Sequence, residues 1–261
     1  MARFMALLYG VAAYLFFLAT FLYAIGFVAN IPGLKTIDGG AGGDGIAAWI
    51  INIVLLGLFA VQHSVMARQG FKRWWTRIVP KPVERSTFVL AASLVLALLI
   101  WQWRPIPGTI WIVEDSIGRA LLIGVFWLGW IVVLVATFLL NHFELFGLQQ
   151  VYDHWRNRSV APPTFKTPAL YKYVRHPIYL GFVLAFWATP HMTQGHLLFA
   201  IATTGYILIG IFFEERDLVA QFGDQYRRYR QRVPMLFPWP GRRAKAEPPP
   251  ERTAPIAGGP S

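Results

Sequence analysis

The stretch of sequence that decides the fold is residues 120–140, which read ALLIGVFWLGWIVVLVATFLL and contain no charged residue. A helix of about 20 apolar residues is long enough to cross the roughly 30 Å hydrocarbon core of a bilayer. Three further apolar runs occupy residues 4–28, 45–66 and 87–103. The sequence therefore predicts an all-α fold, a polytopic transmembrane helical bundle.

A fifth apolar region, residues 178–213, is about twice as long as one span requires. Polar residues interrupt it near the middle: Thr189, Pro190, His191, Gln194, Gly195 and His196. This pattern predicts a helical hairpin with a polar turn, which makes six spans, or five if the hairpin only dips into the bilayer. We expect one membrane domain over residues 1–240, with the hairpin and its flanks at 171–233, and a disordered Pro/Gly-rich cytoplasmic tail at 241–261.

The distribution of charge predicts the orientation of the spans. Residues 67–86 carry six Lys or Arg and one Glu. The alternate loops, at residues 31–44, 104–119 and 191–195, together carry three basic and four acidic residues. Because short basic loops remain on the cytoplasmic side of a membrane, we expect residues 67–86 and both termini to be cytoplasmic.

The composition excludes several classes of protein. The chain is 56% hydrophobic and 14% charged, whereas a soluble domain is usually about 25% charged, so it is not a water-soluble domain. The net charge of +11 does not indicate nucleic-acid binding, because 20 Phe and 11 Trp accompany it. The lack of cysteine excludes a disulfide framework and a Cys nucleophile.

Two polar clusters lie at the predicted ends of spans. Residues 62–64, Gln-His-Ser, end the second span, and residues 141–144, Asn-His-Phe-Glu, follow the fourth. His63, His142 and Glu144 are candidate catalytic residues, because ionisable groups are costly near a bilayer and histidine titrates near neutral pH. An interfacial histidine satisfied by headgroups, or a polar helix end, explains the same residues without catalysis.

The two ends of the predicted hairpin carry a third cluster. It comprises Arg175, His176, Pro177, Tyr179, Gly181, Glu214 and Glu215. Antiparallel halves would place the cationic pair that opens the hairpin opposite the two carboxylates that close it. Pro177 suits the first turn of a helix, and Gly181 one turn later allows another backbone or a ligand to approach closely. An ion-paired interfacial belt is the alternative explanation.

The hairpin ends resemble a known family. The block RHPIYLG at residues 175–181, the pair Glu214-Glu215 and the run FGDQYRRY at residues 222–229 together resemble the integral membrane methyltransferases, which include isoprenylcysteine carboxyl methyltransferase and phospholipid N-methyltransferases. A narrower similarity, to the bacterial methanethiol S-methyltransferases, is found at residues 62–68, 70–75, 84–87, 101–105 and 141–147. A related branch, encoded beside nitrogen-oxide reduction systems, shares the Gln-His-Ser element and leaves the exact acceptor open.

The resemblance implies an enzyme of the bacterial inner membrane that binds S-adenosyl-L-methionine in the hairpin and methylates methanethiol to dimethyl sulfide, by attack of the thiolate on the sulfonium methyl. The expected cofactor-binding residues are Tyr171, Tyr173, Arg175, His176, Pro177, Tyr179, Gly181, Glu214 and Glu215. His63 and His142 are expected to act as a base and its support, with Glu144 beside them. The expected partners are a small volatile thiol and the lipid bilayer, with no nucleic acid and no metal.

Two other functions remain open from the sequence. Within the same enzyme class, the acceptor could be a prenylcysteine or a lipid. In a different class, His63 and His142 could be axial ligands of a haem or another metal in a non-catalytic membrane protein. The second alternative has no Cys ligand and leaves residues 175–181 unexplained.

Overall fold

The computed structural model describes residues 1–40, 45–158 and 164–238. Five of its helices are long and apolar enough to cross a membrane, and they are α1 (Ala2–Val28), α2 (Gly45–Ala67), α4 (Lys81–Gln102), α5 (Ser116–Leu140) and α9 (Gln194–Phe222). The prediction of an all-α polytopic bundle is confirmed. The predicted tail at residues 241–261 lies outside the described residues.

The predicted hairpin has one long arm and one short helical arm. Helix α8 (Pro177–Trp187) has only 11 residues, about 16 Å at the usual rise, which is too short to cross a bilayer as a helix. The chain continues through Ala188 into strand β2 (His191–Thr193), and α9 forms the return arm. Five helices long enough to span and one short apolar helix therefore stand where six spans, or five with a hairpin that only dips into the bilayer, were expected.

A two-stranded sheet, which the sequence analysis did not predict, stands at the turn of the hairpin. Strand β1 (Thr109–Ile112) pairs with β2 in antiparallel register, with Thr109 opposite Thr193 and Ile112 opposite His191. The polar residues of the predicted turn thus lie partly in a strand. The sheet connects the start of α5 with the start of α9.

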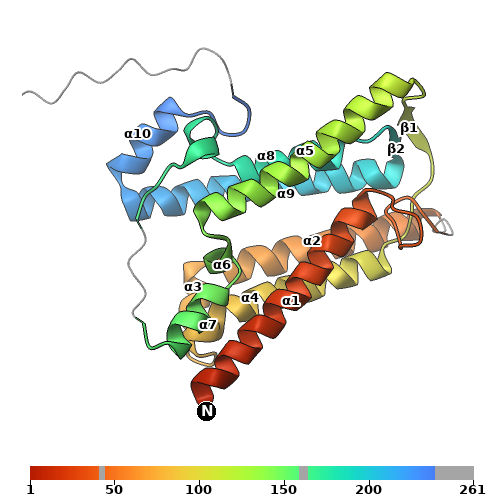
Figure 1. Ribbon diagram of the computed structural model, residues 1–261. Helices are drawn as coiled ribbons and strands as arrows, with labels where there is room; N and C mark the ends of the chain where they lie inside the picture. The colour runs from red at the N-terminus through yellow and green to blue at the C-terminus, as the bar shows by residue number, and fades with distance from the viewer. Residues whose placement is uncertain (41–44, 159–163, 239–261) are drawn as a thin grey trace, which may run out of the picture.

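The short elements gather at the opposite end of the bundle (Figure 1). They are α3 (Gln69–Trp75), α6 (His142–Leu145), α7 (Leu148–Trp155), the 3-10 helix η1 (Ala169–Lys172) and α10 (Asp224–Arg232). The N-terminus lies at this end too, whereas β1, β2 and the segment after α1 lie at the other end (Figure 1). The arrangement agrees with the predicted alternation of loops.

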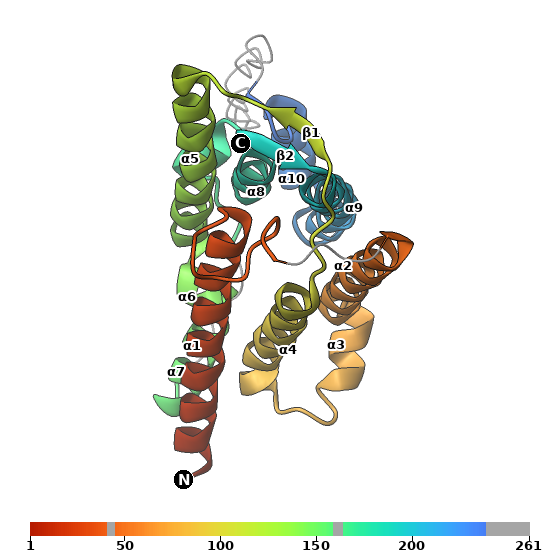
Figure 2. The same cartoon turned by 90° about the vertical axis from the view of Figure 1, so that its right-hand side faces the viewer.

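A pair of glycines allows α5 and α8 to pack backbone to backbone. A Cβ atom added at Gly181 would lie 2.6 Å from the Gly129 carbonyl oxygen, and one added at Gly129 would lie 2.6 Å from the Gly181 carbonyl oxygen. Figure 2 shows α8 between α5 and α9. Of the two explanations offered for Gly181, approach by another backbone is the one that the structure shows.

Candidate active site

The start of α8 is held by the segment that follows α10. The backbone N–H of Arg175 donates to the Pro234 carbonyl at 2.9 Å, and that of His176 donates to the Met235 carbonyl at 3.2 Å. Pro177 occupies the first turn of α8, where a missing N–H costs nothing. The two basic side chains are therefore fixed at a helix start instead of on a free loop.

Arg175 and Glu215 form a buried ion pair at the centre of the site. The Arg175 Nε atom donates to Glu215 Oε1 at 2.7 Å, and His176 Nε2 lies 3.1 Å from the same oxygen. A second guanidinium nitrogen of Arg175 donates to the carbonyls of Arg230, at 2.9 Å, and Val233, at 2.5 Å. Because a buried charge needs such partners, this pair joins α8, α9 and α10 and has little capacity left for a ligand.

Glu214, the neighbour of Glu215, is differently placed. Its Oε2 atom accepts a hydrogen bond from the Tyr179 hydroxyl at 2.9 Å and lies 3.9 Å from His176 Nδ1. Its side chain is 44% exposed, against 11% for Glu215. Of the two carboxylates, Glu214 is the one that a bound molecule can reach.

Three tyrosines surround the ion pair. The Tyr229 hydroxyl donates to the Tyr171 carbonyl at 2.6 Å, and the Tyr226 hydroxyl is buried with no hydrogen-bond partner among the described residues. Burial raises the pKa of Tyr229 to about 12. Burial, with the charge of Glu214, raises the pKa of Tyr171 well above the ordinary value, and burial, with the charges of Glu215 and Glu214, does the same for Tyr226. All three remain protonated at neutral pH, and Tyr226 is a donor without an acceptor in the described part of the chain.

The structure brings together most, but not all, of the predicted cofactor residues. The side chain of Tyr171 is buried near the cluster, and its hydroxyl donates to the Ala136 carbonyl at 3.4 Å. Tyr173, in contrast, is 67% exposed at the end of η1, and Gly181 faces α5. Tyr226, Tyr229 and Arg230 were not selected as site residues, although the first two lie in the run at residues 222–229 that carried part of the resemblance.

His142 lies in an aromatic cluster against α1. Its Nε2 is 2.9 Å from the Tyr14 hydroxyl, its Nδ1 is 3.0 Å from the Thr137 hydroxyl, and its ring stacks on Phe138 at 4.4 Å. Burial lowers the pKa of His142. The side chain of Glu144 does not join it: Glu144 is exposed and accepts a hydrogen bond from Asn141 at 3.0 Å.

His63 lies in a different cluster, between α2, α4 and α9. Its ring stacks on Phe59 at 5.5 Å, is tilted against Phe88 at 4.9 Å and meets Tyr206 edge-on at 6.2 Å. Its Nδ1 atom is buried and has no hydrogen-bond partner in the described part of the chain. Because His63 and His142 have separate sets of neighbours, neither holds the other, and a metal bound by both is not supported.

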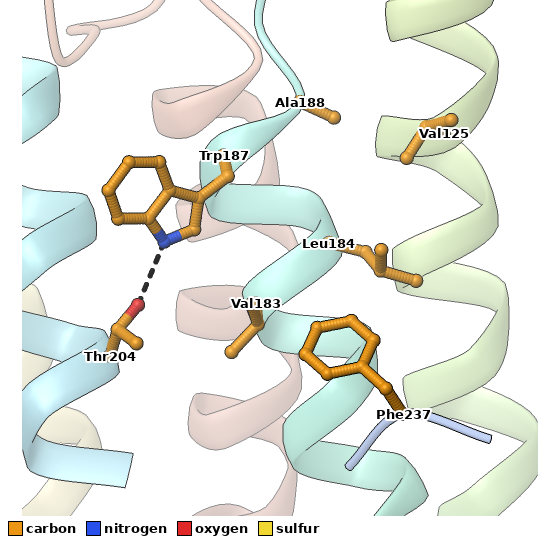
Figure 3. A pocket seen from close by; sticks show the side chains of 7 residues that line it. All are labelled: Val125, Val183, Leu184, Trp187, Ala188, Thr204 and Phe237. Atoms are coloured by element: carbon orange, nitrogen blue, oxygen red, sulfur yellow. Dashed lines mark hydrogen bonds between the residues drawn. The ribbon is translucent and has the colours of Figure 1, made fainter. Parts of the chain in front are cut away.

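An apolar cavity of about 480 Å³ opens between α5, α8 and α9, one helical turn beyond Tyr179 (Figure 3). Figure 3 shows the Trp187 indole pointing to Thr204, to which it donates a hydrogen bond at 2.9 Å, and Phe237 beside Val183 and Leu184. None of the described residues that line this cavity is titratable. The cavity can hold an apolar molecule, but its lining offers no group that could transfer a proton. The ion-paired cluster is therefore the better candidate site.

The fold and this site define a polytopic membrane protein with a buried ion-paired cluster at one end of its bundle. The chain belongs to the family described as NnrU protein, whose family model matches residues 51–235. It is 61% identical to methanethiol S-methyltransferase 1 of Bradyrhizobium diazoefficiens, over 91% of this chain and 83% of the relative. It is 59% identical to the methanethiol S-methyltransferase of Mycobacterium tuberculosis, over 93% of this chain and 99% of the relative.

More distant relatives include the nurim of Xenopus laevis, which is 32% identical over 60% of this chain and 58% of its own length. No solved structure matches the chain. The resemblance to bacterial methanethiol S-methyltransferases that the sequence motifs indicated is confirmed by the relatives that share most of the chain.

Proposed function

We propose that the protein is a membrane methyltransferase that transfers a methyl group from S-adenosylmethionine to methanethiol, which yields dimethyl sulfide. The observation that carries this proposal is the 61% identity, over 91% of the chain, to a protein named methanethiol S-methyltransferase. That coverage includes both histidine clusters and the ion-paired cluster. A match confined to one motif would not support the acceptor.

The ion-paired cluster fits the methyl donor. S-adenosylmethionine supplies a reactive sulfonium methyl when bound, so the protein contributes position and electrostatics. Glu214 offers a partly exposed carboxylate to a cationic or hydroxyl-bearing group, and Tyr226 offers a buried hydroxyl that lacks an acceptor among the residues that the structure describes. We propose these two residues, with Tyr171, as the donor-binding set, and Arg175 and Glu215 as the ion pair that fixes it.

The electrostatics of the cluster suit a cation. Glu214 and Glu215 are consecutive on α9, and Arg175 offsets only one of them at hydrogen-bonding distance. The Glu214 carboxylate therefore favours a positive ligand at this end of the bundle. An alkyl thiol is mostly neutral at pH 7 while the thiolate is the nucleophile, so the acceptor needs a base, which we propose to be a histidine at the same end.

A matched pair of variants tests the donor site. Glu214→Gln removes the accessible carboxylate, and since a hydrogen bond to a charged group contributes about 1.5–3 kcal/mol, the dissociation constant for S-adenosylmethionine should rise about 10- to 150-fold while thermal stability changes little. Glu215→Gln should instead lower the melting temperature, because a neutral amide no longer compensates the buried positive charge of Arg175. Calorimetry and thermal unfolding separate the two effects.

The control for this pair is Asp224→Asn, which alters a carboxylate that is 73% exposed at the start of α10. It should keep both affinity and stability. Wild-type affinity in a folded Glu214→Gln variant would remove the assignment of Glu214. Headspace gas chromatography of the wild-type protein supplied with methanethiol and S-adenosylmethionine tests the reaction, and failure to form dimethyl sulfide would refute the acceptor.

The orientation also belongs to the proposal. We propose that the end of the bundle carrying α3, α6 and α10 faces the cytoplasm, in a bacterial inner membrane. The support is the basic character of the segments at that end, such as residues 67–86 and α10, together with the positive-inside rule. The donor is made in the cytosol, so this orientation gives it direct access to Glu214.

A further inference from the structure

The two candidate bases differ in the use of their ring nitrogens. Both nitrogens of His142 already have a hydroxyl partner, Tyr14 at 2.9 Å and Thr137 at 3.0 Å. His63 has a buried Nδ1 with no partner among residues 1–40, 45–158 and 164–238. A neutral imidazole accepts a proton through a nitrogen that carries a free lone pair. His63 is therefore the histidine that is arranged to receive one.

The surroundings of His63 suit a small apolar thiol. Phe59 and Phe88 lie against its ring from α2 and α4, and Tyr206 approaches its edge from α9. The aromatic faces exclude water, while polarizable sulfur makes favourable contacts with aromatic rings. We call Phe59, His63, Phe88 and Tyr206 the aromatic enclosure.

Tyr206 connects the aromatic enclosure with the donor-binding set. Tyr206 meets the His63 ring edge-on at 6.2 Å, and the phenols of Tyr206 and Tyr179 are close enough to interact electrostatically. Tyr179 in turn donates to Glu214 at 2.9 Å. No sequence motif selected Tyr206, yet its ring lies against His63 and it stands on α9, the helix that also carries the accessible Glu214 carboxylate.

Two cations complete the electrostatics of this region. Arg85, from α4, lies 5.1 Å above the Phe88 ring, which packs against His63 at 4.9 Å. Arg68, at the end of α2, lies 4.5 Å above the Phe213 ring and acts electrostatically on Tyr206. Both positive charges favour an anionic sulfur over a neutral thiol nearby.

We infer, resting on the proposed methyltransferase function, that the thiol acceptor binds in the aromatic enclosure between α2 and α9, with His63 as the general base and Tyr206 as a hydrogen-bond donor to the sulfur. The thiol proton moves to His63 Nδ1 as the sulfur electron pair forms the new S–C bond. The bond between the methyl and the donor sulfur breaks, which leaves two neutral thioethers and an imidazolium. The imidazolium then releases its proton to water. His142 has a structural role.

The first test uses acceptor binding without the donor. In protein carrying isotope-labelled histidine, methanethiol should shift the NMR signal of His63, identified by its loss in His63→Gln, and leave the His142 signal in place. Tyr206→Phe should raise the methanethiol concentration needed for the shift at least several-fold. Tyr9→Phe, which removes a part-buried hydroxyl bonded to Thr87 at 3.0 Å, is the matched control and should match wild type. A shift at His142 alone, or at neither histidine, overturns the proposal.

The second test uses thiol acidity. His63→Gln should lower turnover of methanethiol at pH 7 by about 10² to 10⁴-fold, the usual contribution of a general base, with donor affinity kept within a few-fold. The loss should shrink with thiophenol, which is more acidic and needs less help to ionise. The turnover of the variant should also keep rising with pH where wild type levels off. A merely structural effect would be equal for both thiols at all pH values.

The outcomes distinguish this inference from the proposed function. If wild-type protein forms dimethyl sulfide and His63→Gln has the same turnover and thiol preference, only the assignment of His63 fails. If wild-type protein binds the donor but forms no dimethyl sulfide, the acceptor in the proposed function fails. A loss with His63→Gln that is equal for both thiols refutes the base while retaining the reaction.

Discussion

Replacing Gly181 by alanine tests how α8 is positioned. The new Cβ atom would lie 2.6 Å from the Gly129 carbonyl oxygen, 2.7 Å from Val133 Cγ2 and 2.9 Å from the Val133 backbone nitrogen. Two of these three atoms belong to the backbone of α5, which cannot rotate away as a side chain does. Alanine therefore forces α8 to move away from α5.

The magnitude follows from two opposing terms. Overpacking of a well-packed contact costs about 1–3 kcal/mol, whereas Gly to Ala inside a helix contributes about 1 kcal/mol of stability through propensity. Gly124→Ala, on α5, is the matched control because a Cβ atom there meets nothing within 4 Å. The difference in stability between the two variants should therefore be about 1–3 kcal/mol, with Gly181→Ala the less stable.

The displacement should also reach the site. Helix α8 carries His176 and Tyr179 to the carboxylates of α9, so Gly181→Ala should weaken binding of S-adenosylmethionine, while Gly124→Ala should not. Thermal unfolding in detergent, followed by tryptophan fluorescence, and calorimetric titration provide both measurements. A melting temperature for Gly181→Ala equal to or above that of Gly124→Ala would refute the backbone contact between α5 and α8.

Two further predictions concern the ends of the bundle. Burial alone would raise the pKa of Asp38, but the neighbouring His196 and hydrogen bonds from Thr193, at 2.5 Å, and Asn30, at 2.7 Å, outweigh burial and lower it. A lowered carboxyl pKa stabilises the fold above its unfolded pKa of about 3.9, and this stabilisation is lost as the pH falls through the folded pKa. At pH 7 the free energy of unfolding of Asp38→Asn should thus be about 1–3 kcal/mol lower than that of wild type. This difference in stability should disappear below pH 4, and a difference that does not change with pH contradicts this reasoning. For the orientation, reporter fusions at the two ends of the chain should both report the cytoplasm, and a periplasmic C-terminal signal would show that only one arm of the hairpin crosses.

Most of the fold was predictable because long apolar helices leave a direct mark in the sequence. The run at residues 120–140 lies entirely within α5 (Ser116–Leu140), which begins four residues before it. The start of α4 was placed six residues too late, because the charged residues before Thr87 suggested a loop. The structure begins the helix at Lys81, with Pro82 in its first turn.

The small sheet was not predictable, because its strands are too short to produce a recognisable sequence pattern. Strand β1 has four residues and β2 has three, which is too short for alternation of apolar and polar residues to be read. Pairing of Thr109 with Thr193 depends on which loops meet at one end of the bundle. That information is tertiary and has no local signal.

The candidate site was predictable as a group of residues but not in its internal roles. The expectation of antiparallel hairpin arms correctly placed Arg175 and His176 opposite Glu214 and Glu215. Consecutive residues on a helix point about 100° apart, so one carboxylate faces α8 while its neighbour stays accessible. Spacing along the chain cannot say which of the two does so. The same limit applies to Tyr226, whose burial depends on how α10 packs.

The resemblance at residues 84–87 and 141–147 acquires a physical explanation in the structure. Arg85 Nε donates to the Leu145 carbonyl at 2.7 Å, and the Ser86 hydroxyl donates to the Gly147 carbonyl at 3.1 Å. Gly147 has a φ of +86°, and a Cβ atom there would lie 2.6 Å from the Ser86 backbone nitrogen. These contacts fasten the start of α4 to the loop after α5.

The same contacts, which form a joint between residues 85–86 of α4 and residues 145–147, determine the shape of the aromatic enclosure. Phe88 is one turn beyond Arg85 on α4, and its ring lies 5.1 Å from the Arg85 guanidinium and 4.9 Å from the His63 ring. A change that releases the joint would move Phe88 and so open one wall of the enclosure without touching a reacting group. Loss of activity in a variant of the loop at residues 141–147 is therefore expected even where that loop takes no part in the chemistry. The thiol-acidity test separates the two cases, because an opened wall lowers turnover equally for methanethiol and thiophenol, whereas loss of the base does not.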